Sequence, residues 1–429
     1  MSRSPQAQPA DVQHQRFRMT NGRDIPLGEG SREISSRRLP VTKVAILGSD
    51  FPGDRFELMV SEGDRVAKNS VLLQSRHQSR IKFCTPAGGT VCAIRRGARR
   101  ALMSVEIEVD QSAPTAQFAI PGKAGRENLR NLMLDSGIWT SLRRRPYGCI
   151  PDPERDPQGL LITAIDSQPL APDPAVIIAR YQACFDKGVE ALATLVSCPL
   201  YLCQRPGNTV TSIRADNLVI CEFTGPHPAG LPGTHINRLC AVGHGKHEAW
   251  HIDYQSVIAL GHLLLEGVPW DERVISMAGP AIDRAELVTV TAGAWIHDLV
   301  NAACPDFRGQ ILPGSALNAR LNPGGNAYLG HWQRQLTFLP AASPAVEPSQ
   351  PGPMLPLTTL ENLLPPAFLT VPLLRALLNG DYEQALALGA LELVEEDMAL
   401  VSAACSSGAD YGALLRPMLD QHRQENREN

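Results

Sequence analysis

His247, Glu248 and His251 match the H-E-x-x-H pattern of zinc hydrolases letter for letter. On a helix, histidines four apart share one face and bind zinc, while the glutamate activates a water molecule. In this chain, however, the stretch Trp250–Ile252 reads as a strand, and the first helix cap is Asp253. Residues four apart on a strand are separated by about 13 Å, which is too far to bind one ion. We therefore expect no metal site here and keep a zinc-dependent hydrolase as an alternative function.

A loop rich in glycine and proline is the second candidate site. It follows a strand-like run ending at Phe223, and parallel sheets bind ligands at the carboxyl ends of their strands. The loop lacks the Lys-Ser/Thr of a P-loop, its prolines remove amide donors, and we expect no helix directly after it. We therefore consider two interpretations of this loop to be equally supported: a structural connection and a functional contact surface. The contact residues would be Gly225, Pro226, His227, Pro228, Gly230, Pro232, Gly233, Thr234 and His235.

The rest of the chain carries no catalytic signature. There is no G-x-S-x-G nucleophile elbow, no paired-carboxylate pattern and no glycine-rich nucleotide fingerprint. The ten cysteines are scattered without a Cys-x-x-Cys pair, which argues against iron–sulfur ligation and disulfides. We expect no catalytic residue in this chain.

Composition and charge disfavour two further classes of protein. Lys and Arg number 40 and Asp and Glu 44, and a net charge of −4 argues against a nucleic-acid binder. No apolar stretch reaches the roughly 18 residues that a membrane-spanning helix needs. The first 20 residues are polar and lack the apolar core of a secretory signal, so we interpret residues 1–21 as a disordered extension in the cytosol.

Short β-rich runs from Val41 to Val109 predict a small barrel or sandwich. The glycine-containing turns in Val60–Val66 and Thr85–Val91 match the two turn signatures of the biotinyl/lipoyl-carrier fold. A true carrier needs a lysine at a hairpin tip, whereas Lys82 lies inside an apolar strand run. We expect the carrier fold without the carrier chemistry.

The periodicity changes after the proline-rich joint at residues 146–157. Strands then alternate with helices, which we expect from an N-cap at Asp173 to Leu195 and from Asp253 to Glu266, and this alternation predicts a parallel α/β sheet. A compact β-rich unit follows from Arg273 to about Leu321, and a stretch rich in Pro, Ala and Ser reads as a linker. Leucine and alanine at helical spacing from Leu357 to Gln424 predict a small helical domain.

Several of these stretches, taken in order, resemble the NqrA family, one of the subunit families of the bacterial sodium-translocating NADH:quinone reductase, the Nqr complex. The resemblance covers nearly the whole chain from residue 20, and this collinearity is more specific than any single motif. The matching stretches are Gly22–Pro26, Leu58–Val66, Phe83–Ala87, Leu170–Ile178, Gly225–Ile236, Trp250–Ile252, Ala278–Pro280, Tyr328–Gly330 and Leu391–Asp397.

The resemblance implies a peripheral subunit on the cytoplasmic face of the inner membrane. It would dock on the membrane part of the complex, chiefly the membrane subunit NqrB, in a translocase that oxidises NADH, reduces ubiquinone and exports Na⁺. The FAD, FMN and iron–sulfur centres would belong to other Nqr subunits, with no cofactor bound by this chain. The loop at residues 225–235 would then contact quinone or a partner subunit.

The resemblance also implies a domain series like that of the flavin subunit of proton-pumping NADH dehydrogenase. The expected class is α/β and β multidomain. The expected units are a disordered extension (1–21), a biotinyl/lipoyl-like barrel-sandwich hybrid (22–110), a Rossmann-like parallel α/β domain (111–268), a β-grasp SLBB domain (269–339), a linker (340–356) and a C-terminal helical domain (357–429).

Three departures from the family pattern indicate a shortened member. The segment before Met354 is shorter than is typical, Asn237 replaces a histidine, and Asn318-Ala319 replaces a small Ser-Gly turn. The related Rnf-type complex has a similar subunit with clustered cysteines for iron–sulfur clusters. An Rnf-like electron-transport subunit that lacks these clusters is therefore a further alternative.

Overall fold

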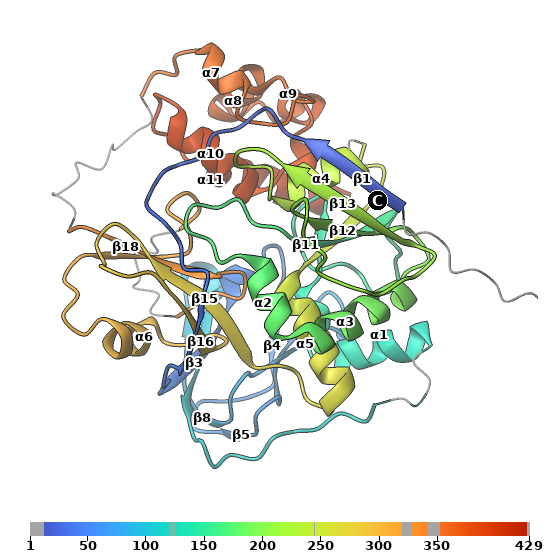
Figure 1. Cartoon of the computed structure of the whole chain (residues 1–429), viewed down its shortest axis with the longest axis vertical. Coiled ribbons are helices and arrows are strands. Elements are labelled where there is room, and N and C mark those ends of the chain that lie inside the picture. The colour runs from blue at the N-terminus through green and yellow to red at the C-terminus, as the bar shows by residue number, and fades with distance from the viewer. Residues whose placement is uncertain are drawn as a thin grey trace, which may run out of the picture.

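The strands form a six-stranded sheet, a five-stranded sheet and two smaller sheets. One group of helices accompanies the six-stranded sheet, and another forms the C-terminal part (Figure 1). The computed structural model describes residues 13–120, 122, 125–243, 245–319, 328–341 and 352–426.

Two small antiparallel sheets form the first unit, and their strands all lie within the β-rich stretch that the sequence predicts between Val41 and Val109. Leu72, Val91 and Val105 are fully buried in the core that the sheets share. Lys82 lies within a strand, as predicted, and its ammonium group pairs with Asp135 at 2.6 Å. One sheet contains β3 (Lys43–Leu47), β9 (Leu102–Val109), β8 (Gly89–Arg96) and β5 (Arg65–Val66), and the other contains β4 (Phe56–Leu58), β6 (Val71–Ser75) and β7 (Lys82–Cys84).

The six-stranded sheet is the centre of the α/β unit, and five of its strands run parallel, as expected from the alternation of strands and helices. Only β10 pairs antiparallel, at one edge. In order across the sheet the strands are β1 (Gln13–Arg18), β13 (Leu218–Thr224), β12 (Leu200–Gln204), β11 (Gly159–Ala164), β14 (Ala249–Asp253) and β10 (Arg143–Arg145).

Two helices of this unit begin where the sequence predicts. The Asp173 side chain accepts a hydrogen bond from the Ala175 amide, and Asp253 does the same for Gln255. The helix expected from Asp173 to Leu195 is interrupted at Tyr181, whose backbone is not helical. The helices are α1 (Arg126–Asp135), α2 (Pro174–Arg180), α3 (Gln182–Leu195), α4 (Pro232–Leu239) and α5 (Tyr254–Glu266).

Residues Gln13–Arg18 form β1, so the interpretation of residues 1–21 as disordered is wrong for this part. β1 pairs residue by residue with β13, and Phe17 stacks on Phe223 with ring centroids 4.8 Å apart. Because Phe17 is the strand's only large apolar residue, its sequence carries almost no hydrophobic signal. Residues 1–12 lie outside the described part of the chain.

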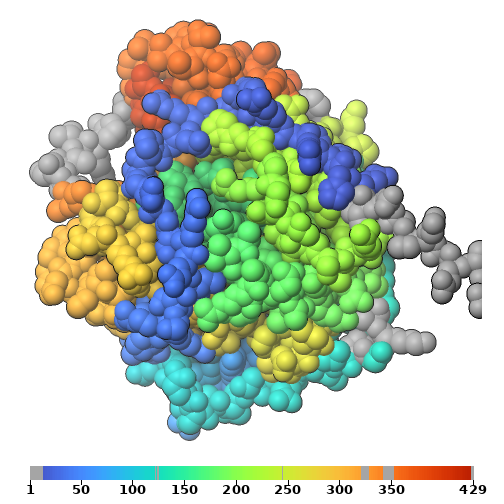
Figure 2. Space-filling model, in the orientation of Figure 1, coloured from blue at the N-terminus to red at the C-terminus, as the bar shows by residue number. Residues whose placement is uncertain are grey.

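The five-stranded sheet also takes a strand from the N-terminal region. Residues Ile34–Arg38 form β2 and pair with β16, whereas the sequence predicts that they belong to the barrel-sandwich unit at 22–110. Figure 2 shows this N-terminal segment as a blue band that crosses the molecule from the green α/β unit to the yellow strands. The other strands are β15 (Glu272–Ala278), β16 (Glu286–Thr291), β17 (Gln310–Pro313) and β18 (Gln335–Leu339), with helix α6 (Ile296–Ala303) between β16 and β17 in the chain.

Helices make up most of the described C-terminal residues. Their apolar faces share a second core, in which Leu373, Val394, Met398 and Leu415 are fully buried. Residues 342–351 of the expected linker lie outside the described part. The helices are α7 (Thr358–Glu361), α8 (Thr370–Asn379), α9 (Tyr382–Ala387), α10 (Glu395–Ala404) and α11 (Tyr411–Glu425).

Across the described ranges, the structure has no helix that is both long enough and apolar enough to span a bilayer.

Candidate functional site

The glycine- and proline-rich loop begins at the carboxyl end of β13, where the sequence placed it. The expectation that no helix follows is wrong, because α4 starts inside the segment at Pro232. A proline fits there, since the first helical position needs no hydrogen-bonded amide. The loop and the first turns of α4 therefore form one compact connection.

Both histidines of the loop are buried. His227 is 1% exposed, and its Nδ1 lies 3.1 Å from the Ser167 hydroxyl. His235 is fully buried; its Nε2 donates to the Ala229 carbonyl at 2.9 Å, and its ring packs against Phe223. Burial lowers the pKa of each imidazole to about 4, so both are neutral near pH 7.

Two glycines of the loop mark places where other segments approach its backbone closely. Gly225 has φ of +129°, and an added Cβ would lie 2.2 Å from the Met19 carbonyl oxygen. A Cβ on Gly233 would lie 2.1 Å from a carboxylate oxygen of Asp397 on α10. The loop thus joins the N-terminal segment and the C-terminal helices to the α/β unit.

These contacts support the structural interpretation of the loop. Of its nine candidate residues, Gly225 is exposed and Pro226 and Pro232 are partly exposed. The other six are buried in contacts within the chain: His227, Pro228, Gly230, Gly233, Thr234 and His235. Within the candidate loop, it is the edge near Gly225 and Pro226 that remains open to a partner.

The H-E-x-x-H residues do not lie on a helix. Residues Trp250–Ile252 belong to β14, which confirms the predicted strand. His247 is exposed outside the strand, whereas His251 is buried within it. The Glu248 carboxylate pairs with Arg144 and Arg155. In the described part of the chain no group of three potential ligands could hold a metal ion.

Buried polar contacts join the units of the molecule. The fully buried Arg145 of β10 donates to Asp397 at 2.7 Å and to Glu396 at 2.9 Å, both on α10. Arg334, next to β18, pairs with Asp253 at 2.9 Å. The sequence carries no local signal for these contacts, because their partners lie up to 252 residues apart along the chain.

Tyr328 links the five-stranded sheet unit to the barrel-sandwich unit. Its hydroxyl donates to a carboxylate oxygen of Glu106 on β9 at 3.0 Å, and both side chains are buried. Like the ion pairs of Arg145 and Arg334, this contact satisfies polar groups that packing between units removes from water.

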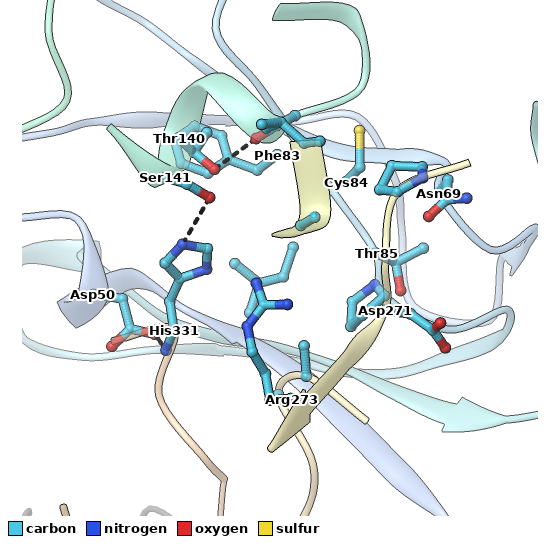
Figure 3. A pocket seen from close by; sticks show the side chains of 18 of the residues that line it. Asp50, Asn69, Phe83, Cys84, Thr85, Thr140, Ser141, Asp271, Arg273 and His331 are labelled. Atoms are coloured by element: carbon cyan, nitrogen blue, oxygen red, sulfur yellow. Dashed lines mark hydrogen bonds between the residues drawn. The ribbon is translucent and has the colours of Figure 1, made fainter. Parts of the chain in front are cut away.

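A cavity of about 120 Å³ lies where the barrel-sandwich unit, the turn Ile138–Ser141 and the five-stranded sheet meet (Figure 3). Figure 3 shows the Arg273 side chain extending between His331 and Asp271. The His331 ring lies 3.4 Å from the Ser141 hydroxyl, and its amide donates to Asp50 at 2.8 Å. No motif in the sequence pointed to this group of residues.

Burial controls the charges around this cavity. Burial and the neighbouring Arg273 lower the pKa of His331 to about 3, so the imidazole is neutral. Burial raises the pKa of Asp50 to about 6 and that of the Cys84 thiol to about 12. Cys84 is therefore a thiol near pH 7, and the Arg273 guanidinium can donate hydrogen bonds to an acceptor oxygen in the cavity.

Fold and candidate site together define a multidomain α/β protein whose glycine- and proline-rich loop is a buried junction between its units. The NqrA N-terminal barrel-sandwich hybrid domain matches residues 17–110, and the NqrA second alpha/beta domain matches residues 124–269.

Three relatives are named as the NqrA subunit of the Na(+)-translocating NADH-quinone reductase. Those of Pseudomonas aeruginosa and Shewanella frigidimarina are each 35% identical to this chain and cover 95% and 94% of it, with 100% and 98% of their own lengths matched. That of Klebsiella pneumoniae is 34% identical over 95% of this chain and all of its own length. The chain belongs to this family.

A solved NAD⁺-reducing NiFe hydrogenase is 14% identical, covering 53% of this chain and 52% of its own. Its TM-score of 0.38 is too low to support any argument.

Proposed function

We propose that this chain is the cofactor-free NqrA subunit of a sodium-pumping NADH:ubiquinone oxidoreductase, bound peripherally at the cytoplasmic face of the inner membrane. The observation that carries the proposal is the similarity to NqrA proteins along essentially their whole length. The NADH, flavin, iron–sulfur and quinone chemistry of the complex then belongs to its partner subunits.

A scaffold role fits the way in which the units are joined. Arg145 and Arg334 each bury a guanidinium between two units, and removing one partner of such a pair typically costs about 3–5 kcal/mol. Units held in this way present their surfaces in a fixed relation. A fixed surface is what docking on a membrane partner, chiefly NqrB, requires.

Ubiquinone contact is the finer part of the proposal. A quinone ring carries two carbonyl oxygens, which accept hydrogen bonds. The cavity in Figure 3 offers Arg273 and the Ser141–His331 pair as donors, while Phe51 and Phe83 supply apolar walls. The open loop edge at Gly225 and Pro226 is the proposed contact for a partner subunit.

We also propose that the α/β unit is Rossmann-like and that the five-stranded sheet with α6 is a β-grasp SLBB domain. The parallel strands of the first and the mixed sheet with one helix in the second support these assignments.

Affinity purification of the tagged chain from its native membranes tests the proposal. The expected result is recovery of flavin-bearing membrane subunits together with quinone reductase activity, while the chain purified alone shows no flavin or iron–sulfur absorbance. Recovery of the chain alone, or a stoichiometric redox centre or zinc ion within it, would contradict the proposal. An iron–sulfur centre would favour the Rnf-like alternative, and a zinc ion the hydrolase.

A pair of variants tests the loop edge. Pro226→Glu adds a charge at the edge and should lower the recovery of partner subunits several-fold, because a buried unpaired charge is costly at an interface. Pro305→Glu adds the same charge at an exposed position beside α6 and should leave recovery unchanged. Equal recovery for both variants would exclude the edge as a docking site.

A further inference from the structure

Two adjoining hollows lie between the barrel-sandwich unit, the residues that follow β10 and the end of α11. Their volumes are about 460 and 390 Å³, and both are lined by Asp54, His77 and Arg423. They lie apart from the cavity of Figure 3 and take no part in the function proposed above.

Arg423, in the last turn of α11, is the unusual residue of these hollows. Its side chain is 7% exposed, and its Nε and Nη1 atoms are buried without a hydrogen-bond partner. Within the described part of the chain no carboxylate forms an ion pair with it. An added Cβ on Gly53 would lie 2.0 Å from Nη1, so the guanidinium fits closely over a residue that has no side chain.

Two carboxylates that line the smaller hollow with Arg423 have other hydrogen-bond or ion-pair partners. The Asp54 carboxylate accepts a hydrogen bond from the Ser75 hydroxyl at 2.7 Å. The Asp420 carboxylate, one turn earlier on α11, lies 3.7 Å from the guanidinium of Arg416. Neither carboxylate forms an ion pair with Arg423, although the positive charge of Arg423 still acts on Asp420.

The larger hollow carries a small excess of positive charge, because its lining holds four Lys and Arg side chains and three carboxylates, which include Asp54 and Asp152. Glu248 is shared by Arg144 and Arg155, which leaves two guanidinium groups for one carboxylate. Lys246 adds a further, exposed ammonium group. An anion that enters the hollow would therefore meet a favourable potential.

We propose that these hollows form a binding site for a phosphate group, with Arg423 as its central ligand. Burying the Nε and Nη1 groups without a hydrogen-bond partner is unfavourable, and a bound anion could satisfy them. Its planar fork of N–H donors matches phosphate oxygens. Lys246 and Arg155 at the rim would attract the anion and bind its outer oxygens.

The phosphate group belongs either to a free small molecule or to the headgroup of an anionic lipid. The two sources share the same recognition by Arg423. Inorganic phosphate and pyrophosphate represent the first source, and vesicles of phosphatidylcholine with or without phosphatidic acid represent the second.

Calorimetric titration of the full chain, in a buffer free of phosphate and sulfate, tests the proposal. The unchanged protein is expected to bind either phosphate and pyrophosphate or only those vesicles that contain phosphatidic acid. Arg423→Gln should weaken this binding about tenfold or more, because a charge-assisted hydrogen bond is lost. Arg375→Gln removes the same charge at an exposed position on α8 and should bind normally.

Lys246→Gln provides a second variant that does not disturb the buried region. Because its side chain is exposed, a weakened binding would not be the result of misfolding, and we expect a loss of a few-fold that diminishes at high salt. Absence of binding to every probe, or equal binding by the Arg423→Gln variant and the unchanged protein, would overturn the proposal.

Discussion

At the scale of single residues, burial changes the interpretation of the two loop histidines, His227 and His235. As residues in a loop they suggested a surface that contacts a ligand, but each imidazole is enclosed by other parts of the chain. A buried neutral histidine carries a free-energy cost when it is protonated. His227 and His235 therefore make the stability of the fold depend on pH.

We predict that His235→Gln reduces this pH dependence. The folded-state pKa is about 4, below the ordinary 6.5, so the unfolded chain binds the extra proton and stability falls as the pH drops from 6.5 towards 4. At pH 5 one such histidine costs about 2 kcal/mol. Glutamine can keep the hydrogen bond to the Ala229 carbonyl without this titration.

Urea unfolding at pH 7.5 and pH 5 measures the effect. The difference in unfolding free energy between the two pH values should be smaller by about 2 kcal/mol in the variant than in the unchanged protein. His297→Gln, at an exposed position on α6, serves as the control and should leave the difference unaltered. An equal pH dependence in all three proteins would contradict the prediction.

At the scale of secondary-structure elements, β1 and β2 show how tertiary pairing creates strands from polar sequence. β1 pairs with β13 in the six-stranded sheet, while β2 pairs with β16 in the five-stranded sheet. A single short N-terminal segment, residues 13–38, therefore provides an edge strand to each of two sheets. Edge strands are half exposed, and so they can be polar.

Phe17 should contribute much of the binding of β1 to the sheet. Its ring stacks on Phe223, and Phe17→Ala removes this partly buried contact, so we predict a loss of about 1–2 kcal/mol of stability. His14→Ala alters an exposed residue of the same strand and serves as the control. Hydrogen exchange should reveal faster exchange of the β1 amides in Phe17→Ala only; unchanged exchange would show that backbone pairing alone holds the strand.

At the scale of the whole molecule, contacts between units decide whether the chain unfolds in one step. The C-terminal helices have a core of their own, and Arg145 forms a buried ionic link from them to the α/β unit. Asp397 also accepts the Val394 amide and lies against Gly233 at the start of α4. The Asp397 carboxylate on α10 thus contacts both β10 and α4 of the α/β unit.

Arg145→Met should separate the C-terminal helices from the rest of the protein in unfolding. It leaves the buried Asp397 without its cation, and Glu396 with only the 3.7 Å contact to Arg143, which costs about 3–5 kcal/mol. We expect a second, earlier calorimetric transition and faster proteolysis near residues 352–357. Arg214→Met changes an exposed position and should unfold like the unchanged protein. If Arg145→Met also unfolds like the unchanged protein, apolar contacts alone hold the C-terminal helices in place.

The sequence by itself determined those features that depend on near neighbours. The strands of the barrel-sandwich unit, the parallel α/β alternation, the N-caps at Asp173 and Asp253 and the strand at Trp250–Ile252 follow from periodicity and local hydrogen bonding. The same strand assignment placed His247 and His251 off a helix. Only local chemistry was needed in each case.

The tertiary structure alone decided which polar residues are buried and what they face. Asp397 contacts Arg145, which lies 252 residues away in the sequence, and Arg423 contacts Gly53 over an even larger sequence separation. Periodicity cannot encode such encounters, because burial depends on which surfaces pack together after the elements have formed. The junction at the loop, the cavity around Arg273 and the unpaired guanidinium of Arg423 all arise at this last stage.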